Sequence, residues 1–93
     1  MELPLAALVA GATGWRDGHA AVASGMLATA QLASEDELSE AVQAYAAVQA
    51  RAYMREQASA LELTPREAVV LFRTYFRAYG NGVLDEAAQR ATG

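Results

Sequence analysis

The sequence lacks cysteine, lysine and isoleucine altogether, and it contains only one histidine, one tryptophan and two prolines among 93 residues. Without cysteine the chain has no disulfide, no thiolate metal ligand and no thiol nucleophile, which excludes the class of small disulfide-rich secreted proteins. A single histidine also excludes metal motifs that depend on a pair of histidines. Because all seven basic residues are arginine, the composition is typical of a GC-rich genome and indicates a bacterial or phage source.

Charge is scarce as well: charged residues make up 19% of the chain, hydrophobic residues make up 54%, and the formal net charge is -4. This balance excludes an intrinsically disordered chain. The apolar stretch over residues 3–12 is much shorter than the roughly twenty residues of a membrane-spanning helix, and Glu2 precedes it where a signal peptide has basic residues. We therefore expect a single acidic, cytoplasmic domain over residues 1–93, with no membrane partner.

The residue that is plentiful is alanine, which supplies nearly half of the hydrophobic residues and is the best helix former. Patterns typical of strands are weak, because no stretch alternates apolar and polar residues over several positions. The sequence predicts an all-α fold, a compact bundle of four to five helices. Its long third helix, over about 35–61, packs on an aromatic fourth helix over about 65–79. The other helices are expected over about 3–12, 18–32 and 83–91.

Two capping boxes mark predicted helix starts. Ser34 and Glu37 form the first, and Thr64 and Glu67 form the second, with Pro65 at the first helical position. In each box the two residues satisfy backbone amides that a helix start leaves without partners. We therefore expect the third and fourth helices to begin at these residues.

Glycines mark the predicted breaks. Gly11, Gly14 and Gly18 separate the first two helices, and Gly80 ends the fourth before a turn. An alternative interpretation stays open, because Gly14 and Gly18 lie four residues apart. In that case one continuous helix begins near Leu3 and has a groove of small residues along it.

Apolar faces predict the core. On the third helix we expect the core face to contain Leu38, Ala41, Val42, Tyr45, Val48, Ala52 and Tyr53. On the fourth helix the core face is richer in rings and contains Ala68, Val69, Leu71, Phe72, Tyr75, Phe76 and Tyr79. The other side of the third helix carries further alanines, which either face solvent or receive a second helix. Together with the ring-bearing face they offer more apolar area than so small a chain covers alone, which favours a homo-oligomer.

The fourth helix also carries a row of cations. Arg66, Arg73 and Arg77 are spaced by 7 and 4 residues, so they fall within about 40° of one another around the helix. We call these three residues the arginine stripe. It is a candidate partner-binding site, because a planar guanidinium group binds carboxylates and phosphates through two hydrogen bonds. The alternative is that these arginines pair with acidic residues of the chain or stay solvated.

Trp15 is the other candidate partner-binding residue. It is the only tryptophan of the chain, and tryptophan is enriched among the residues that contribute most to protein interfaces. The alternative interpretation is that its ring fills the core of its own chain.

Nucleic acid is the alternative partner of the arginine stripe. Residues Leu63–Leu71 resemble the opening of the LuxR-type helix-turn-helix domain, whose first helix commonly begins with Leu-Thr-Pro-Arg-Glu. The resemblance covers nine residues, and the thirteen residues after Gly80 are too few for the remaining helices of that domain, so the family is not assigned. A net charge of -4 also opposes nonspecific attraction to phosphates.

Catalysis has few candidate residues. His19 is the only histidine, and no serine has a base nearby in the sequence. The acidic residues 35–37 and Glu40 lack the alternating oxygen spacing of a calcium loop, and helix capping explains them. We therefore expect a non-enzymatic protein with no cofactor and no metal. It would act as an adaptor, inhibitor or accessory subunit by binding another protein or itself, and a helix-turn-helix-like regulator is the alternative.

Overall fold

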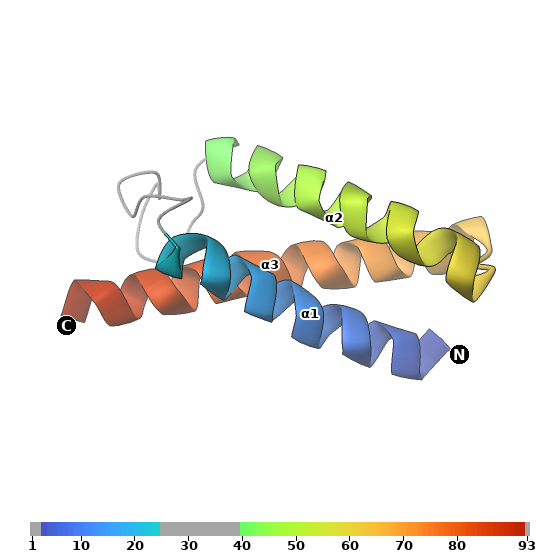
Figure 1. Cartoon of the computed structure of the whole chain (residues 1–93), viewed down its shortest axis with the longest axis horizontal. Helices are drawn as coiled ribbons and strands as arrows, with labels where there is room; N and C mark the ends of the chain where they lie inside the picture. Colours follow the sequence, from blue (N-terminus) through green and yellow to red (C-terminus); the bar gives the residue numbers. More distant parts are fainter. Residues whose placement is uncertain (1–2, 25–39, 93) are drawn as a thin grey trace.

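The computed structural model describes residues 3–24 and 40–92 of the chain. This part consists of three helices, in the order α1 (Leu3–Ala23), α2 (Glu40–Leu61) and α3 (Pro65–Thr92). Figure 1 shows the helices extending along the long axis of the molecule. The molecule extends over 42, 21 and 20 Å along its three principal axes. The described residues contain no strand, so the all-α fold class is confirmed for them.

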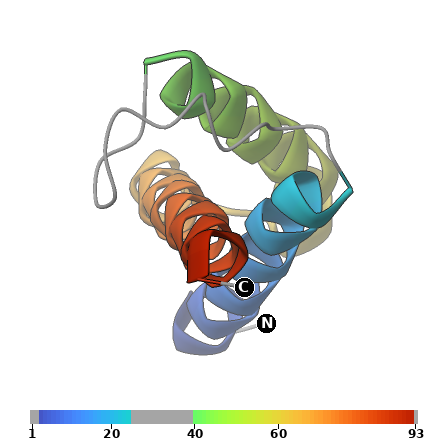
Figure 2. The same ribbon diagram turned by 90° about the vertical axis from the view of Figure 1, so that its left-hand side faces the viewer.

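The three helices contribute to a common core, and Figure 2 shows their arrangement end-on. α1 packs extensively against α3, whereas α2 contacts α3 less extensively. The buried core takes its hydrophobic side chains from all three helices: Ala6, Ala10, Ala21 and Val22 of α1, Val42, Ala46 and Ala50 of α2, and Leu71, Tyr75, Tyr79 and Val83 of α3. Within the described ranges, no helix is both long and apolar enough to cross a membrane.

Glycines allow α1 and α3 to approach each other closely. Gly14 and Gly18 are buried, and a Cβ atom on Gly14 would lie 2.6 Å from the carbonyl oxygen of Tyr75. A Cβ atom on Gly18 would lie even closer to the carbonyl oxygen of Tyr79. The two backbones therefore touch directly. The predicted break at residues 11–18 is wrong, and the alternative of one continuous helix with a small-residue groove is correct, because packing on α3 outweighs the intrinsic cost of glycine in a helix.

α3 also continues where the sequence predicts an end. Gly80 and Gly82 both lie buried inside the helix, and a Cβ atom on Gly82 would clash with the carbonyl oxygen of Trp15. Gly82 therefore serves close packing on α1, and this packing offsets the roughly 1 kcal/mol that a glycine costs inside a helix. The helices predicted over about 65–79 and 83–91 are one helix. With both predicted breaks absent, the described residues form three helices where four to five were expected.

The junction between α2 and α3 follows the predicted capping chemistry. α2 ends at Leu61, as expected, and the next residue, Glu62, has a positive φ of 50°. The amide of Thr64 donates to Oε1 of Glu67 over 3.0 Å, and the amide of Glu67 donates to Oγ1 of Thr64 over 3.2 Å. This reciprocal pair confirms the second capping box. Hydrogen bonds that the Glu67 carboxylate accepts from the backbone amide of Thr64 and, to a lesser extent, from the Thr64 side chain lower the pKa of Glu67.

The rings of α3 turn toward the core, as predicted, although not all of them are fully buried. Leu71 is fully buried, Tyr75 and Tyr79 are each 2% exposed, and Phe72 and Phe76 pack against the edge of the core. Val69, by contrast, is largely exposed. The core face of α3 is therefore narrower than the predicted face and is centred on Leu71 and the two tyrosines.

The core face of α2 overlaps the predicted one in part: Val42 is buried and Tyr45 and Tyr53 pack against the core, as predicted. Val48 is 51% exposed, whereas Ala46 and Ala50 are fully buried. The physical reason is side-chain size, because the alanines leave room for the large tyrosine rings of α3. Tyr45 and Tyr53 flank these alanines and place their rings against those of α3. Ala50, which is not part of the predicted core face, is therefore a core residue.

Some predicted features lie outside the described residues. These are most of the second half of the helix predicted over about 18–32, the capping box of Ser34 and Glu37, the acidic residues 35–37 and the core position Leu38. The third predicted helix is described from Glu40 onward.

Candidate protein-interaction surface

The outer face of α1 is apolar. Leu5, Leu8, Ala12 and Trp15 follow one another at intervals of three, four and three residues, so they fall within about 80° around the helix axis. Leu5 is 52% exposed, Leu8 70% and Trp15 40%, and Ala12 is also exposed. We call these four residues the α1 stripe. They lie on the opposite side of the helix from its buried residues Ala6, Ala10, Gly14 and Gly18.

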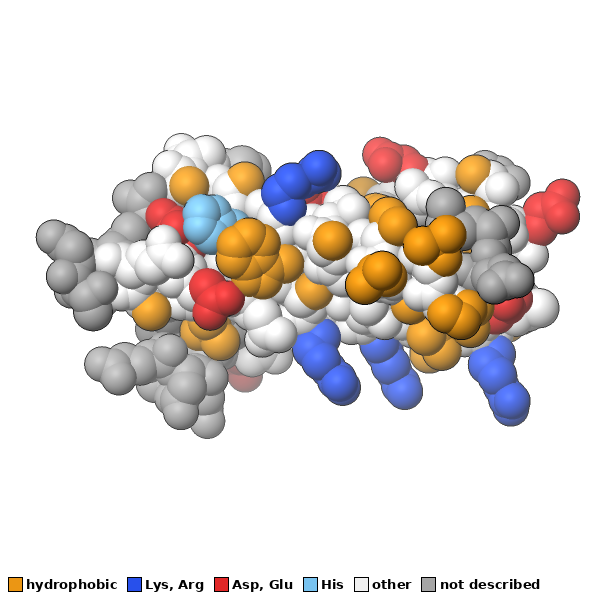
Figure 3. All heavy atoms as spheres, turned by 90° about the horizontal axis from the view of Figure 1, so that it is seen from below, with side chains coloured by type: hydrophobic (Ala, Val, Ile, Leu, Met, Phe, Trp, Pro, Cys, Tyr) orange, Lys and Arg blue, Asp and Glu red, His pale blue; other side chains and the backbone are white. Residues whose placement is uncertain are grey.

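The α1 stripe is unusual for a surface helix, because the solvent-facing side of such a helix is normally polar or charged. Residues 3–15 contain no charged side chain, and Figure 3 shows apolar side chains gathered along this face of the molecule. Single exposed apolar residues are ordinary, but a contiguous row of them marks an interaction site. The three-four-three spacing was the sequence signal for this row, and the interpretation of residues 3–12 as a short first helix missed it.

The arginine stripe of α3 lies along one flank of the α1 stripe. Arg66, Arg73 and Arg77 are all exposed, as their spacing predicts, and Figure 3 shows basic side chains projecting along one edge of the same face. None of the three forms an ion pair with another residue that the structure describes. Within the described ranges, their guanidinium groups therefore lie exposed and without an acidic partner.

A shallow groove of about 480 Å³ lies between α1 and the arginine stripe. Its lining consists of Gly11 of α1 and Val70, Arg73, Thr74, Arg77, Ala78 and Asn81 of α3. Gly11, which has no side chain, is the α1 residue that lines the groove, and it directly precedes Ala12 of the α1 stripe. Arg73 and Arg77 thus border a hollow that an acidic side chain of another molecule can enter.

Trp15 is held in place by the C-terminal part of α3. Its Nε1 donates to Oδ2 of Asp85 over 2.9 Å, and its ring lies 4.9 Å from the ring of His19 at an angle of 33°. Nε2 of His19 in turn lies 2.7 Å from Oε2 of Glu86, which is only 8% exposed. Trp15 therefore does not fill the core. It presents an ordered, partly exposed ring at one end of the α1 stripe.

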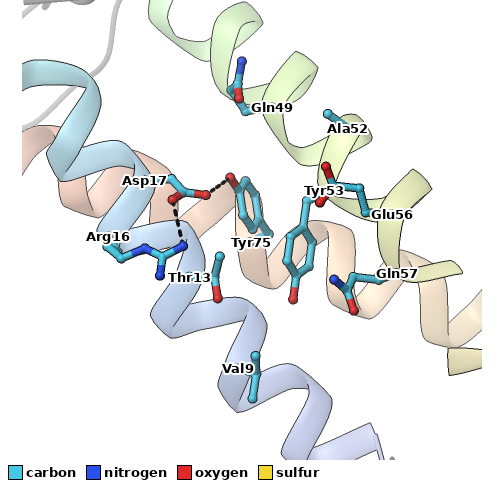
Figure 4. Close-up of a pocket in the computed structure, with 10 residues that line it drawn as sticks. All are labelled: Val9, Thr13, Arg16, Asp17, Gln49, Ala52, Tyr53, Glu56, Gln57 and Tyr75. Atoms are coloured by element: carbon cyan, nitrogen blue, oxygen red, sulfur yellow. Dashed lines mark hydrogen bonds and ion pairs between the residues drawn. The ribbon is translucent and has the colours of Figure 1, made fainter. Parts of the chain in front are cut away.

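A second cleft, of about 300 Å³, lies between the three helices on the other flank of the α1 stripe. Figure 4 shows the hydroxyl of Tyr75 pointing at Asp17, and it donates to Oδ2 of that carboxylate over 2.6 Å. Arg16 lies 3.4 Å from the other carboxylate oxygen. The rings of Tyr53 and Tyr75 stack with their centroids 4.5 Å apart. These contacts connect all three helices.

Tyr53, Tyr75 and Tyr79 each have a raised pKa, so their hydroxyls stay protonated at neutral pH. Burial raises the pKa of Tyr75 above its ordinary value, and the hydrogen bond to Asp17 raises it further. Burial also raises the pKa of Tyr53 and of Tyr79, and the negative charge of Asp17 adds to both shifts. The hydroxyl of Tyr75 is therefore a hydrogen-bond donor rather than a base, and we assign the cleft a structural role.

The structure brings the predicted partner-binding residues onto adjoining surfaces. Arg73 and Arg77 share the groove beside α1, Arg66 extends the arginine stripe, and Trp15 ends the α1 stripe. His19 contacts Glu86, and no group of three metal-ligating side chains occurs among the described residues. A comparison of the chain with protein-family models, with curated proteins and with solved structures finds no match, so a functional proposal rests on this surface alone.

Proposed function

We propose that this protein is a small non-catalytic interaction protein, an adaptor, inhibitor or accessory subunit, which binds another protein through the α1 stripe and the arginine stripe. The observation that carries the proposal is the aligned exposure of Leu5, Leu8 and Trp15 on a helix whose other side is packed. A partner that covers these side chains gains about 25 cal/mol for each Å² of apolar area removed from water. The adjoining arginines add specificity through paired hydrogen bonds. On the sequence grounds of composition and charge, we place this activity in the cytoplasm.

The surface that favours self-association in the structure differs from the one that the sequence predicts. The sequence-based dimer hypothesis relied on the rings of α3 and the alanines of α2, but Tyr75, Tyr79 and Ala50 are buried within one chain. These three side chains are therefore not available to a second copy. Val48, Val69 and Val70 stay exposed on α2 and α3, but the α1 stripe contains the most exposed leucines, and a second copy is expected to bind there.

Site-specific photo-crosslinking in the native host tests the proposal. A photoreactive residue at Leu8, in the middle of the α1 stripe, is expected to give a covalent adduct with a protein. The same residue at Arg51, which is exposed on α2, serves as the matched control and is expected to give none. Adducts at both positions, or at neither, contradict the proposal.

Nucleic-acid binding by the arginine stripe is the alternative proposal. The exposed row of Arg66, Arg73 and Arg77 favours it. The net charge of -4 opposes it, and α3 runs through residues 80–82 without the turn that a helix-turn-helix would need there. A gel shift at low salt separates the proposals. A complex that weakens when the three arginines are changed to glutamine supports nucleic-acid binding, and the absence of any complex removes it.

A further inference from the structure

We infer that the partner segment is an amphipathic α-helix with an apolar seam and an acidic flank. Its seam docks on the α1 stripe, and its carboxylates meet Arg66, Arg73 and Arg77. This inference rests on the proposed function and names the partner of the same surface. Three features carry it: the spacing of the α1 stripe, the shape of its centre and the charge on its flank.

The spacing of the α1 stripe selects a helix as the occupant. Intervals of three and four residues are those of the a and d positions along which two helices pack. From Leu5 to Trp15 the stripe covers ten residue steps, or about 15 Å along the axis. A partner helix of about three turns matches this length with an apolar side chain every three or four residues. A strand, whose side chains alternate every second residue, does not match it.

The middle of the stripe has the shape of a hole for a partner side chain. Leu8, Gly11, Ala12 and Trp15 stand at positions i, i+3, i+4 and i+7, the four positions that surround a knob in helix packing. Leu8 and Trp15 have large side chains, whereas Gly11 and Ala12 have small ones. The surface between the two large side chains therefore forms a depression. A leucine or methionine of the partner fits this depression and contacts both large side chains.

The charge beside the hole indicates carboxylates on the partner. Arg73 and Arg77 line the groove that begins at Gly11. Neither they nor Arg66 form an ion pair among the described residues. Guanidinium groups bind carboxylates through short, charge-assisted hydrogen bonds. A helix lying on the α1 stripe therefore carries aspartate or glutamate along the side that faces α3.

A second copy of this chain fits the surface less well. Residues 3–15 of its α1 contain no acidic side chain to meet the arginines. Among the described residues, Asp85 already accepts from Trp15 and Glu86 already contacts His19. These contacts favour a different chain as the source of the complementary charge.

Two synthetic helical peptides of equal length test the inference. Both carry leucine along the seam and neither contains tryptophan, but one has glutamate and the other lysine at the flanking positions. Fluorescence of Trp15, the only tryptophan of the chain, then reports binding inside the site. We expect the glutamate peptide to bind about tenfold more tightly at low salt, and the difference to shrink as salt screens the charges. The net charge of -4 attracts the lysine peptide, so a preference for glutamate must come from the local arginines.

Variants of the chain test whether the arginine stripe causes the preference for the glutamate peptide. Changing Arg66, Arg73 and Arg77 together to glutamine is expected to remove the preference for the glutamate peptide. Changing Arg51 and Arg55, which are exposed on α2, to glutamine is the matched control and is expected to leave the preference in place.

The inference is overturned by equal affinity for the two peptides, by tighter binding of the lysine peptide, or by binding that survives Leu8→Ser. The absence of binding by either peptide overturns it too. In that last case a protein cross-linked at Leu8 shows that the proposed function stands with a partner of another shape. Failure of the cross-link itself contradicts the proposed function.

Discussion

Replacing a glycine of α1 by alanine, which adds one methyl group, is expected to have opposite effects at Gly18 and Gly11. Gly18→Ala places a Cβ atom against the carbonyl oxygen of Tyr79, which belongs to the backbone and cannot rotate away. We expect this change to lower the free energy of unfolding by about 1–3 kcal/mol, although alanine is the better helix former by about 1 kcal/mol. Gly11→Ala is the matched control, because its Cβ atom would lie 3.6 Å from Cγ2 of Thr74, an ordinary contact.

Urea unfolding followed by circular dichroism measures both glycine variants. Gly11→Ala is expected to raise the free energy of unfolding by up to about 1 kcal/mol. If Gly18→Ala proves as stable as Gly11→Ala, the backbones of α1 and α3 do not touch as described.

The buried hydroxyl of Tyr75 makes stability depend on pH in the alkaline range. Its pKa is higher in the folded chain than its ordinary value of 10.0. Its contribution is therefore fully present below that value and is lost as pH rises toward the folded pKa. Tyr75→Phe removes this group, so stability is expected to fall less steeply above about pH 10, by up to about 1.4 kcal/mol per pH unit. Urea unfolding at several alkaline pH values measures the slope, and an unchanged slope argues against burial of the hydroxyl.

The first turn of α3 depends on its capping box. Thr64→Ala removes the oxygen that accepts from the amide of Glu67, and we expect it to lower the free energy of unfolding by about 1 kcal/mol. Thr64→Ser keeps a hydroxyl at the same place and is expected to lose much less. Chemical denaturation of the two variants makes the comparison, and equal losses would show that the hydroxyl does not stabilise the helix start.

At the scale of the whole molecule, the leucine that stabilises the fold differs from the leucine that we expect to contact a partner. Leu8 is 70% exposed and Leu71 is fully buried. Leu8→Ser is expected to change the free energy of unfolding by less than about 0.5 kcal/mol, whereas Leu71→Ala is expected to lower it by about 2–5 kcal/mol. Thermal unfolding of the purified variants tests both values. A large loss for Leu8→Ser would mean that this leucine packs within its own chain.

Much of the candidate surface was predictable from the sequence, but not all of it. The spacing of Arg66, Arg73 and Arg77 on one side of a helix follows from the helical repeat alone. The α1 stripe does not, because an apolar row belongs to the core or to the surface depending on which face a neighbouring helix covers. Here α3 covers the glycine and alanine side of α1, and this leaves Leu5 and Leu8 outside.

Taken by itself, the sequence determined that the chain is helical, where α3 begins and which rings of α3 turn inward. These properties depend on neighbours within one helical turn, such as Thr64 and Glu67, or on the periodicity of side chains along one helix. Only the tertiary structure decided that α1 and α3 continue through their glycines, and which faces of α1 and α2 are exposed. A glycine weakens an isolated helix, but opposite another backbone it permits a contact that no other residue allows. Whether Gly18 or Gly82 breaks or joins its helix therefore depends on the helix packed against it, which the local sequence does not specify.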